Sequence, residues 1–429
     1  MKDWRSISKN RNCPNPCSIE FLLLFFLVLS FLFLSCSSKR VFKKNPLYQH
    51  YRDATQYYLP QSTGAIQWAV FARADKAPGQ DLILLARNKD QKPHIEVMLN
   101  RGKKGFHIKK NAVSEKGMGN FLRYLAAGDL NRDGHDDLVV LTRSVQGSSA
   151  RLLVNNKKGY FYVDPKMVLP ALPPGVNRVD LVDLDNDRDL DLFFTGSKIL
   201  DSKGGINRFQ ALAVINNRQN GFRDATSILL PSLKQGIVQT SFADYNGDGV
   251  VDAFLIYGND QNRLLINNGL GKFIDRTRSS LPQFMDPSTH ADWADFDQDG
   301  DNDLLVTNGK RSRRSSLAQG FSYFLENDGL GNFKIRKHPM LPNTPSRRVY
   351  LLDANGSGQV DILILGDEKT VFLTGRGNWE FNDDSLKRLP GSSHFLEMAF
   401  ADTDRNGYLD ILGISKIDRK ITLWVNRFD

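Results

Sequence analysis

The sequence predicts an all-β fold: seven four-stranded units closed into a ring, the architecture called a β-propeller. Three observations carry this prediction. An acidic segment recurs six times, a strand–turn–strand pattern follows most copies, and the two ends of the chain complement each other. The segment Ala243–Gly258, ADYNGDGVVDAFLIYG, shows the repeat because alternating acidic and amide side chains lead directly into an apolar, β-favouring stretch. The chain has 429 residues, 41% of them hydrophobic, which allows a core in every unit.

The spacing of the acidic segments fits one supersecondary unit per repeat. Their first aspartates stand at 129, 183, 244, 295, 353 and 402, so the intervals run from 49 to 61 residues. Repeats of this length are typical of four-stranded propeller blades. A degenerate unit precedes them: residues 71–106 keep the strand pattern but lose most of the acidic loop. Counting it gives seven blades.

A second pattern follows the acidic segments and predicts the outer half of each blade. LLVNNKKGYF from Leu152 and FLENDGLGNF from Phe324 read as a strand, an Asn/Gly turn and a strand that opens with an aromatic residue. Asparagine and glycine tolerate the positive φ angles that such turns need. Leu-Pro pairs then mark the links between units, and we interpret them as core and bend residues.

The two ends of the chain supply parts of one blade. The C-terminal ITLWVNRFD provides a third strand but no fourth. Near the other end, YRDATQYYLP (51–60) matches FRDATSILLP (222–231), the fourth strand and link of the third unit. The N-terminal strand is therefore expected to complete the seventh blade and close the ring. We assign residues 48–429 to this single propeller.

The acidic loops have the composition of calcium sites. Ca²⁺ takes six to eight hard oxygen ligands, and positions 1, 3, 5 and 9 of each loop present carboxylate, amide or hydroxyl oxygens. An EF-hand is excluded because position 12 is never glutamate and each loop enters a β-favouring run. The candidate ligands are Asp129, Asn131, Asp133 and Asp137; Asp183, Asp185, Asp187 and Asp191; Asp244, Asn246, Asp248 and Asp252; Asp295, Asp297, Asp299 and Asp303; Asp353, Asn355, Ser357 and Asp361; and Asp402, Asp404, Asn406 and Asp410.

The six loops differ in quality. The loop that starts at Asp295 has four aspartates and a turn glycine at position 6, and those starting at Asp129 and Asp402 are nearly as good. The Asp183 loop has four carboxylates, but Arg188 replaces the glycine expected at its turn. The Asp353 loop offers only two carboxylates. Single loops are alternatively ordinary Asp/Asn turns. We expect about four to six Ca²⁺ ions, which stabilise hairpins and catalyse nothing.

The first 36 residues read as an export signal. A polar leader precedes FLLLFFLVLSFLFL (21–34), which suits the apolar core of a signal peptide better than a bilayer span of about 20 residues. The boundary FLSC resembles the lipobox of bacterial lipoproteins, although Phe33 stands where leucine is usual. It predicts a lipidated Cys36, a linker over residues 37–47 and a place in the cell envelope, at the outer membrane or facing the periplasm. Ordinary secretion and an uncleaved anchor are the alternatives.

Together these features resemble the calcium-binding FG-GAP or VCBS-repeat β-propellers, similar to the head of integrin α chains and to many exported bacterial proteins. The resemblance covers residues 49–429 and implies a non-catalytic binding or adhesion scaffold with structural calcium. Some polysaccharide lyases are calcium-dependent propellers of this repeat class, so a carbohydrate-active enzyme is an alternative by analogy of fold. A subunit of an envelope assembly complex is a further one.

A partner is expected on the face opposite the acidic loops, where the longer connections lie. The stretch Gly309–Gly320 carries the candidate contacts Lys310, Arg311, Arg313 and Arg314, and Ser346–Arg348 adds charge on the same side. A glycan or an envelope protein is the expected partner, and a merely solvated loop is the alternative. Nucleic acid is not expected for an exported chain despite its net charge of +9, nor is a small-molecule cofactor. No catalytic residue is assigned, because the seven histidines lack metal-ligand spacing.

Overall fold

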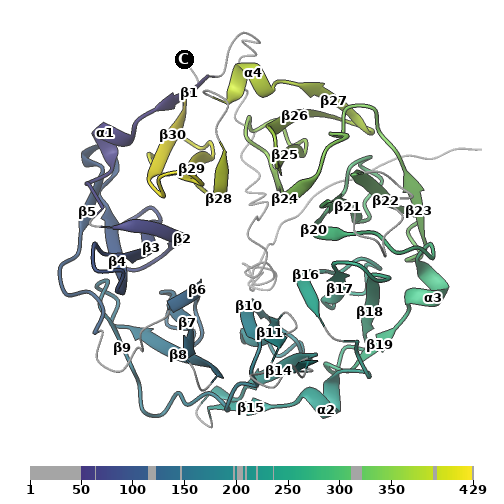
Figure 1. Ribbon diagram of the computed structural model, residues 1–429, viewed down its shortest axis with the longest axis horizontal. Helices are drawn as coiled ribbons and strands as arrows, with labels where there is room; N and C mark the ends of the chain where they lie inside the picture. Colours follow the sequence, from purple (N-terminus) through teal and green to yellow (C-terminus); the bar gives the residue numbers. More distant parts are fainter. Residues whose placement is uncertain are drawn as a thin grey trace, which may run out of the picture.

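The protein is described by a computed structural model that covers residues 50–427, except 63, 115–121, 145–146, 197–198, 201–205, 208–209, 219–220, 235, 311–320 and 390–393. The expected signal peptide, Cys36 and the linker lie outside the described residues. Seven four-stranded antiparallel sheets stand around a central axis (Figure 1), which confirms the predicted fold class. Within the described part, no helix is long and apolar enough to cross a membrane.

Each blade runs from an inner strand beside the axis to an outer strand at the rim (Figure 1). Blade by blade, the strands are β2 (Ala65–Ala72), β3 (Asp81–Arg87), β4 (Pro93–Asn100) and β5 (Phe106–Ile108); β6 (Leu122–Gly128), β7 (Asp137–Ser144), β8 (Gly147–Asn155) and β9 (Phe161–Tyr162); β10 (Val176–Val182), β11 (Asp191–Gly196), β14 (Ala211–Asn216) and β15 (Phe222–Asp224); β16 (Ile237–Ala243), β17 (Asp252–Tyr257), β18 (Arg263–Asn267) and β19 (Phe273–Asp275); β20 (Ser288–Ala294), β21 (Asp303–Asn308), β22 (Ser322–Asn327) and β23 (Phe333–Arg336); β24 (Ser346–Leu352), β25 (Asp361–Gly366), β26 (Thr370–Gly377) and β27 (Glu380–Asp383); and β28 (Phe395–Ala401), β29 (Asp410–Ser415) and β30 (Ile421–Arg427) with β1 (His50–Asp53).

The smaller elements lie between these strands. A short hairpin of β12 (Ile199–Leu200) and β13 (Ile206–Asn207) is inserted between β11 and β14 of blade 3. Single-turn helices follow four of the outer strands and begin the links to the next blade. They are α1 (Thr55–Tyr58), α2 (Thr226–Leu229), α3 (Thr277–Ser280) and α4 (Ser385–Arg388).

The N-terminal strand closes the ring, as the sequence predicts. β1 pairs antiparallel with β30 from His50 opposite Arg427 to Asp53 opposite Trp424, and it forms the outer edge of the blade that starts with β28. The Tyr51 hydroxyl donates to the Leu409 carbonyl at 3.2 Å. Chain ends more than 350 residues apart therefore share one sheet.

Every pair of neighbouring blades shares one apolar core. Seven clusters of buried side chains each draw residues from two adjacent blades, and the one across the closure includes Ala54, Leu59 and Leu423. The second strands are buried on both faces because both neighbours pack against them. The Leu-Pro leucines contribute to these cores, as expected: Leu281 and Leu389 are buried.

Candidate metal loops and channel mouth

The six acidic loops share one backbone conformation, which their own side chains stabilise. In blade 4, the Asp244 carboxylate accepts hydrogen bonds from the amides of Asp248 at 3.1 Å and Gly249 at 2.8 Å. The equivalent pair of bonds forms at Asp129, Asp183, Asp353 and Asp402. Each ionised carboxylate has about four lone-pair sites, so these turns leave ligand capacity on the same oxygens.

The position-6 residue adopts a left-handed conformation in every loop, whether or not it is glycine. Gly134 has a φ of 87° and Gly300 one of 101°, while Arg188 has a φ of 72°. The Asp183 loop therefore keeps the turn geometry of the others. It does so with a side chain that disfavours this region by about 1–2 kcal/mol.

Three loops bring three carboxylates together. The groups Asp183, Asp185 and Asp191, then Asp295, Asp297 and Asp299, and then Asp402, Asp404 and Asp410 each place one oxygen per residue within 4.8 Å of the others. The other three loops all have asparagine at position 3, namely Asn131, Asn246 and Asn355, where each clustered loop has aspartate. In the Asp129 loop, Lys157 also places its ammonium 3.6 Å from Asp133.

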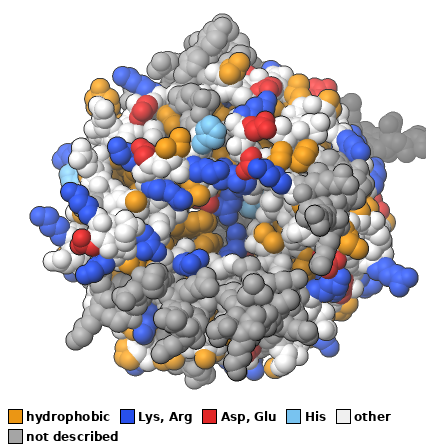
Figure 2. Space-filling view, in the orientation of Figure 1, with side chains coloured by type: hydrophobic (Ala, Val, Ile, Leu, Met, Phe, Trp, Pro, Cys, Tyr) orange, Lys and Arg blue, Asp and Glu red, His pale blue; other side chains and the backbone are white. Residues whose placement is uncertain are grey.

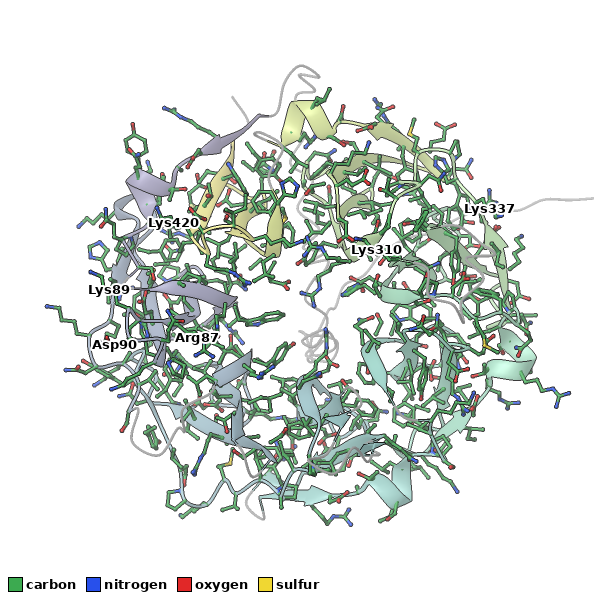
Figure 3. All side chains as sticks on the ribbon, in the orientation of Figure 1. Arg87, Lys89, Asp90, Lys310, Lys337 and Lys420 are labelled. Atoms are coloured by element: carbon green, nitrogen blue, oxygen red, sulfur yellow. The ribbon has the colours of Figure 1, made fainter. Side chains whose placement is uncertain are left out.

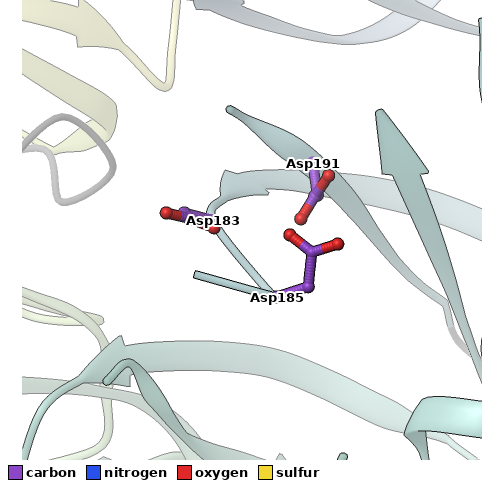
Figure 4. Close-up of side chains that lie close together, drawn as sticks. All are labelled: Asp183, Asp185 and Asp191. Atoms are coloured by element: carbon purple, nitrogen blue, oxygen red, sulfur yellow. The ribbon is translucent and has the colours of Figure 1, made fainter. Parts of the chain in front are cut away.

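The Asp183 group tests whether these residues suit a metal ion. Figure 4 shows the carboxylates of Asp185 and Asp191 facing one another. Asp185 Oδ1 is shielded from solvent and makes no hydrogen bond. Burial, followed by the charge of Asp187, raises the pKa of Asp185, and burial raises the pKa of Asp191 to about 8. A hard cation would satisfy the free oxygen and offset the repulsion, so the clustered aspartates can hold a metal.

The position-9 aspartates also have a structural role that the sequence analysis did not foresee. Asp191 accepts hydrogen bonds from the amides of Leu184 at 2.8 Å and Asn216 at 2.7 Å. Asn216 in turn donates through Nδ2 to the Leu130 carbonyl of the preceding blade at 2.8 Å. The hairpin asparagine thus ties one blade to the next. The same link recurs from Asn100 to Thr403, Asn155 to Ala74, Asn267 to Leu184, Asn327 to Tyr245 and Asn426 to Ala354.

The loops between second and third strands lie at the opposite ends of the blades, as antiparallel pairing requires. Figure 3 marks Lys89, Lys310 and Lys420, which come from these connections in three blades. Lys310 is exposed, and its ammonium lies 3.9 Å from the carboxylate of Asp367. The other candidate contacts, Arg311, Arg313 and Arg314, lie outside the described residues.

On this face, one side chain per blade points to the axis. Every inner strand has a shift in its pairing register near its start. The first paired residue after this shift occupies the equivalent position in all seven blades, at the same height along the channel. We call this set the axial ring: Trp68, Tyr124, Arg178, Gln239, His290, Arg348 and Glu397. Figure 2 shows Lys and Arg side chains gathered around the central hollow.

Contacts join the members of the axial ring. The Trp68 and Tyr124 rings lie 4.7 Å apart, and the Arg348 guanidinium lies 5.4 Å from the Trp68 ring centre. Arg348 forms an ion pair with Glu397, which also accepts a hydrogen bond from the Tyr350 hydroxyl at 2.5 Å. Five members of the ring line a cavity of about 210 Å³, namely Arg178, Gln239, His290, Arg348 and Glu397, and Arg347 lines it with them.

The charge predicted for Ser346–Arg348 does lie on this side, since Arg347 and Arg348 line the cavity, but the axial ring was not predicted. The signal was present in the aligned repeats: the ring residue stands five positions before the first residue of each loop, for example Arg178 before Asp183. That position reads Trp, Tyr, Arg, Gln, His, Arg and Glu along the seven units. The recurrence of polar and aromatic residues at this one position of all seven inner strands indicates a shared axial surface.

Comparisons with known proteins agree with this architecture. The model of the FG-GAP-like repeat matches residues 129–194, 244–306 and 353–413. The chain is therefore a seven-bladed β-propeller that carries FG-GAP-like repeats. The search of curated protein sequences gave no significant match.

Among solved structures, a lectin of Agrocybe aegerita, described as recognising non-reducing terminal N-acetylglucosamine, is similar with a TM-score of 0.51. Its sequence is 16% identical, and the match covers 76% of this chain and 81% of the lectin. The V. cholerae biofilm matrix protein Bap1 gives a TM-score of 0.38 at 12% identity, over 89% of this chain and 62% of that protein. At 16% identity, the likeness to the lectin shows the fold alone.

Proposed function

We propose that the protein is a calcium-stabilised, non-catalytic binding scaffold of the cell envelope. It engages a glycan or an envelope protein through the face opposite the acidic loops and is anchored by a lipid on Cys36. The observation that supports this most is the difference between the two faces. One face carries the six acidic hairpins, three of which bring three carboxylates together, whereas the other carries the basic connections and the polar channel mouth.

Calcium fits this scaffold as a structural ion. About four to six Ca²⁺ ions would be held by the oxygens at positions 1, 3, 5 and 9 of the loops. Bound Ca²⁺ supplies positive charge to clustered carboxylates. The chain's own Asx turns preset the loops, and the hairpin asparagines connect every loop except the one that starts at Asp295 to the next blade.

The test is binding of the full-length chain to a panel of acidic and neutral glycans and to envelope extracts, with calcium or with chelator. The triple variant R311Q/R313Q/R314Q is expected to lose binding at least tenfold. The matched control K103Q/K104Q/K110Q removes the same charge from exposed positions beside β5, at the rim of blade 1, and is expected to bind normally. Equal affinity of both variants would contradict a partner site at this loop.

A lyase acting on acidic polysaccharide is a second candidate, favoured by the histidine, tyrosine and arginine side chains that converge at the channel mouth. In such a β-elimination, a base removes the proton beside the uronate carboxylate, a carbon–carbon double bond forms, and the leaving oxygen departs with a proton. The unsaturated product absorbs in the ultraviolet. Absorbance that rises with acidic polysaccharide and is abolished in H290N would support this candidate.

A further inference from the structure

We propose that the axial ring binds one oxyanion group, the carboxylate or sulfate of a terminal acidic sugar, at the channel mouth. This inference rests on the proposed glycan-binding function and gives it a site. All seven side chains of the ring come from described inner strands.

The unsatisfied groups of the axial ring are mainly hydrogen-bond donors. Trp68 Nε1 is shielded from solvent and makes no hydrogen bond, and an indole N–H can only donate. Arg178 bonds to Asp180 through Nε at 2.9 Å, and its terminal nitrogens have no hydrogen-bond partner among the described residues. The amide of Gln239, in contrast, is engaged through both its oxygen and its nitrogen. Beside these donors, Asp180 Oδ2 is a buried acceptor without a hydrogen bond. The unpaired donors of Arg178, which lines the cavity, call for a ligand rich in acceptors.

His290 shows that the positive charges converge. It is 8% exposed, and its Nδ1 makes no hydrogen bond. Burial, followed by the charges of Arg348 and Arg178, lowers the pKa of His290 well below its usual value. The positive charges of Arg178 in blade 3 and Arg348 in blade 6 therefore both reach His290 in the cavity. The neutral imidazole adds a further polar group there.

The nearby carboxylates leave one edge of each arginine available. Arg178 pairs with Asp180 and Arg348 with Glu397, so each guanidinium is neutralised on one side. Burial raises the pKa of Asp292 to about 7, so this neighbour is only partly charged at neutral pH. A guanidinium has five N–H donors in a fork that matches a carboxylate or sulfate. An oxyanion between Arg178 and Arg348 would also offset the repulsion that acts between these two groups.

The size of the cavity limits how much of a ligand can enter. Its volume of about 210 Å³ is below the roughly 300–1,000 Å³ of sites that enclose a drug-sized ligand. One charged group or one sugar residue fits this space, and the remainder of a saccharide would extend outward over the loop face. The cavity would therefore recognise the terminal acidic sugar of a saccharide from its end.

The experiment is calorimetric titration of the full-length chain, in calcium-containing buffer, with three probes: methyl glucuronoside, its neutral methyl ester and glucose 6-sulfate. We expect saturable binding of the glucuronoside and at least tenfold weaker binding of the ester. Comparison of glucose 6-sulfate with the glucuronoside shows whether the site prefers a sulfate or a carboxylate. Binding of either charged probe but not of the ester supports the site.

Paired variants locate the site. R178Q/D180N removes an ion pair together, so no buried charge is left without a partner, and it should weaken binding of the charged probe at least tenfold. R263Q/D275N removes a pair with a similarly buried arginine in blade 4, far from the axis, and should bind normally. Thermal unfolding confirms that each variant is folded. If R178Q/D180N does not fold, H290N replaces it, with an expected loss of at least threefold.

The outcomes separate this inference from the broader function. Charged-probe affinity that is unchanged in R178Q/D180N, or equally reduced in the control, overturns the axial site. Neutral glycans that bind the wild type and both variants equally leave the scaffold function intact and refute the oxyanion site. A folded chain that binds no glycan and no envelope protein refutes both.

Discussion

At the scale of single residues, the loops show how a repeat tolerates an unfavourable side chain. Arg188 has a φ of 72°, where the five other loops have glycine. Its backbone amide still donates to the Asp183 carboxylate, as the amide at position 6 does in the other loops. The Gly134 position is open, with no atom within 4 Å of an added Cβ. The backbone conformation, not steric contact, therefore decides how much a side chain at position 6 lowers the stability of the fold.

The cost of the left-handed conformation predicts opposite effects for two reciprocal substitutions. R188G should raise the free energy of unfolding by about 0.5–1 kcal/mol, because relief of the left-handed conformation exceeds the added entropy of the unfolded chain. G134R should lower it by about 1 kcal/mol for the same reason. Chemical denaturation of both variants in chelator measures the effect without bound metal. Two shifts of the same sign would show that contacts of the side chain, not φ, control stability there.

At the scale of elements, blade 6 departs from the repeat in a way that couples it to the neighbouring loop. Its third strand has Gly375 where the other blades have the linking asparagine. Trp379 makes the connection to blade 5 instead: its amide donates to the Phe296 carbonyl at 3.2 Å, and its indole Nε1 donates to Asp297 Oδ2 at 2.9 Å. A tryptophan that is 6% exposed thus contacts a candidate metal ligand.

Calcium binding to the loop that starts at Asp295 is therefore expected to change the emission of Trp379. The indole bonds to a carboxylate whose charge the ion would offset, so both polarity and geometry around the ring change. In a calcium titration, W379F should lose most of the fluorescence change. W293F is the matched control, because Trp293 is similarly buried but its Nε1 makes no hydrogen bond. A full calcium response in W379F would refute the coupling.

The elements also show what the sequence could and could not predict. Repeat spacing and turn residues predicted the blades, the acidic loops and hairpins such as Asn327 opposite Phe333, because these depend on local patterns. The axial ring, the links between blades and the role of Trp379 depend on contacts between residues 47 or more positions apart. Periodicity within one repeat does not reveal such contacts, although alignment of the repeats exposes the ring position.

At the scale of the whole molecule, stability depends on closure. Each blade buries its faces against two neighbours, so an open ring would expose the apolar faces of two blades and the edge of β30. The seventh sheet is shared between the chain ends, and the aspartate–asparagine link from Asn100 to the Thr403 carbonyl at 2.9 Å crosses the same closure. The cost of loop closure grows only slowly with chain length, so joining distant ends is compatible with a stable fold.

Tyr51 is the residue by which this closure can be tested. It lies in β1, is 6% exposed, packs in the core between blades 6 and 7, and donates to Leu409. Y51A should lower the free energy of unfolding by about 3–5 kcal/mol, the usual cost of truncating a buried aromatic residue. Tyr57, six positions along the chain and 77% exposed, provides the matched control, and Y57A should change stability by less than about 0.5 kcal/mol. Denaturant unfolding of both variants measures the difference. Equal stability of the two variants would mean that the N-terminal strand does not hold the ring closed, and the seventh blade would then have to be stable with three strands.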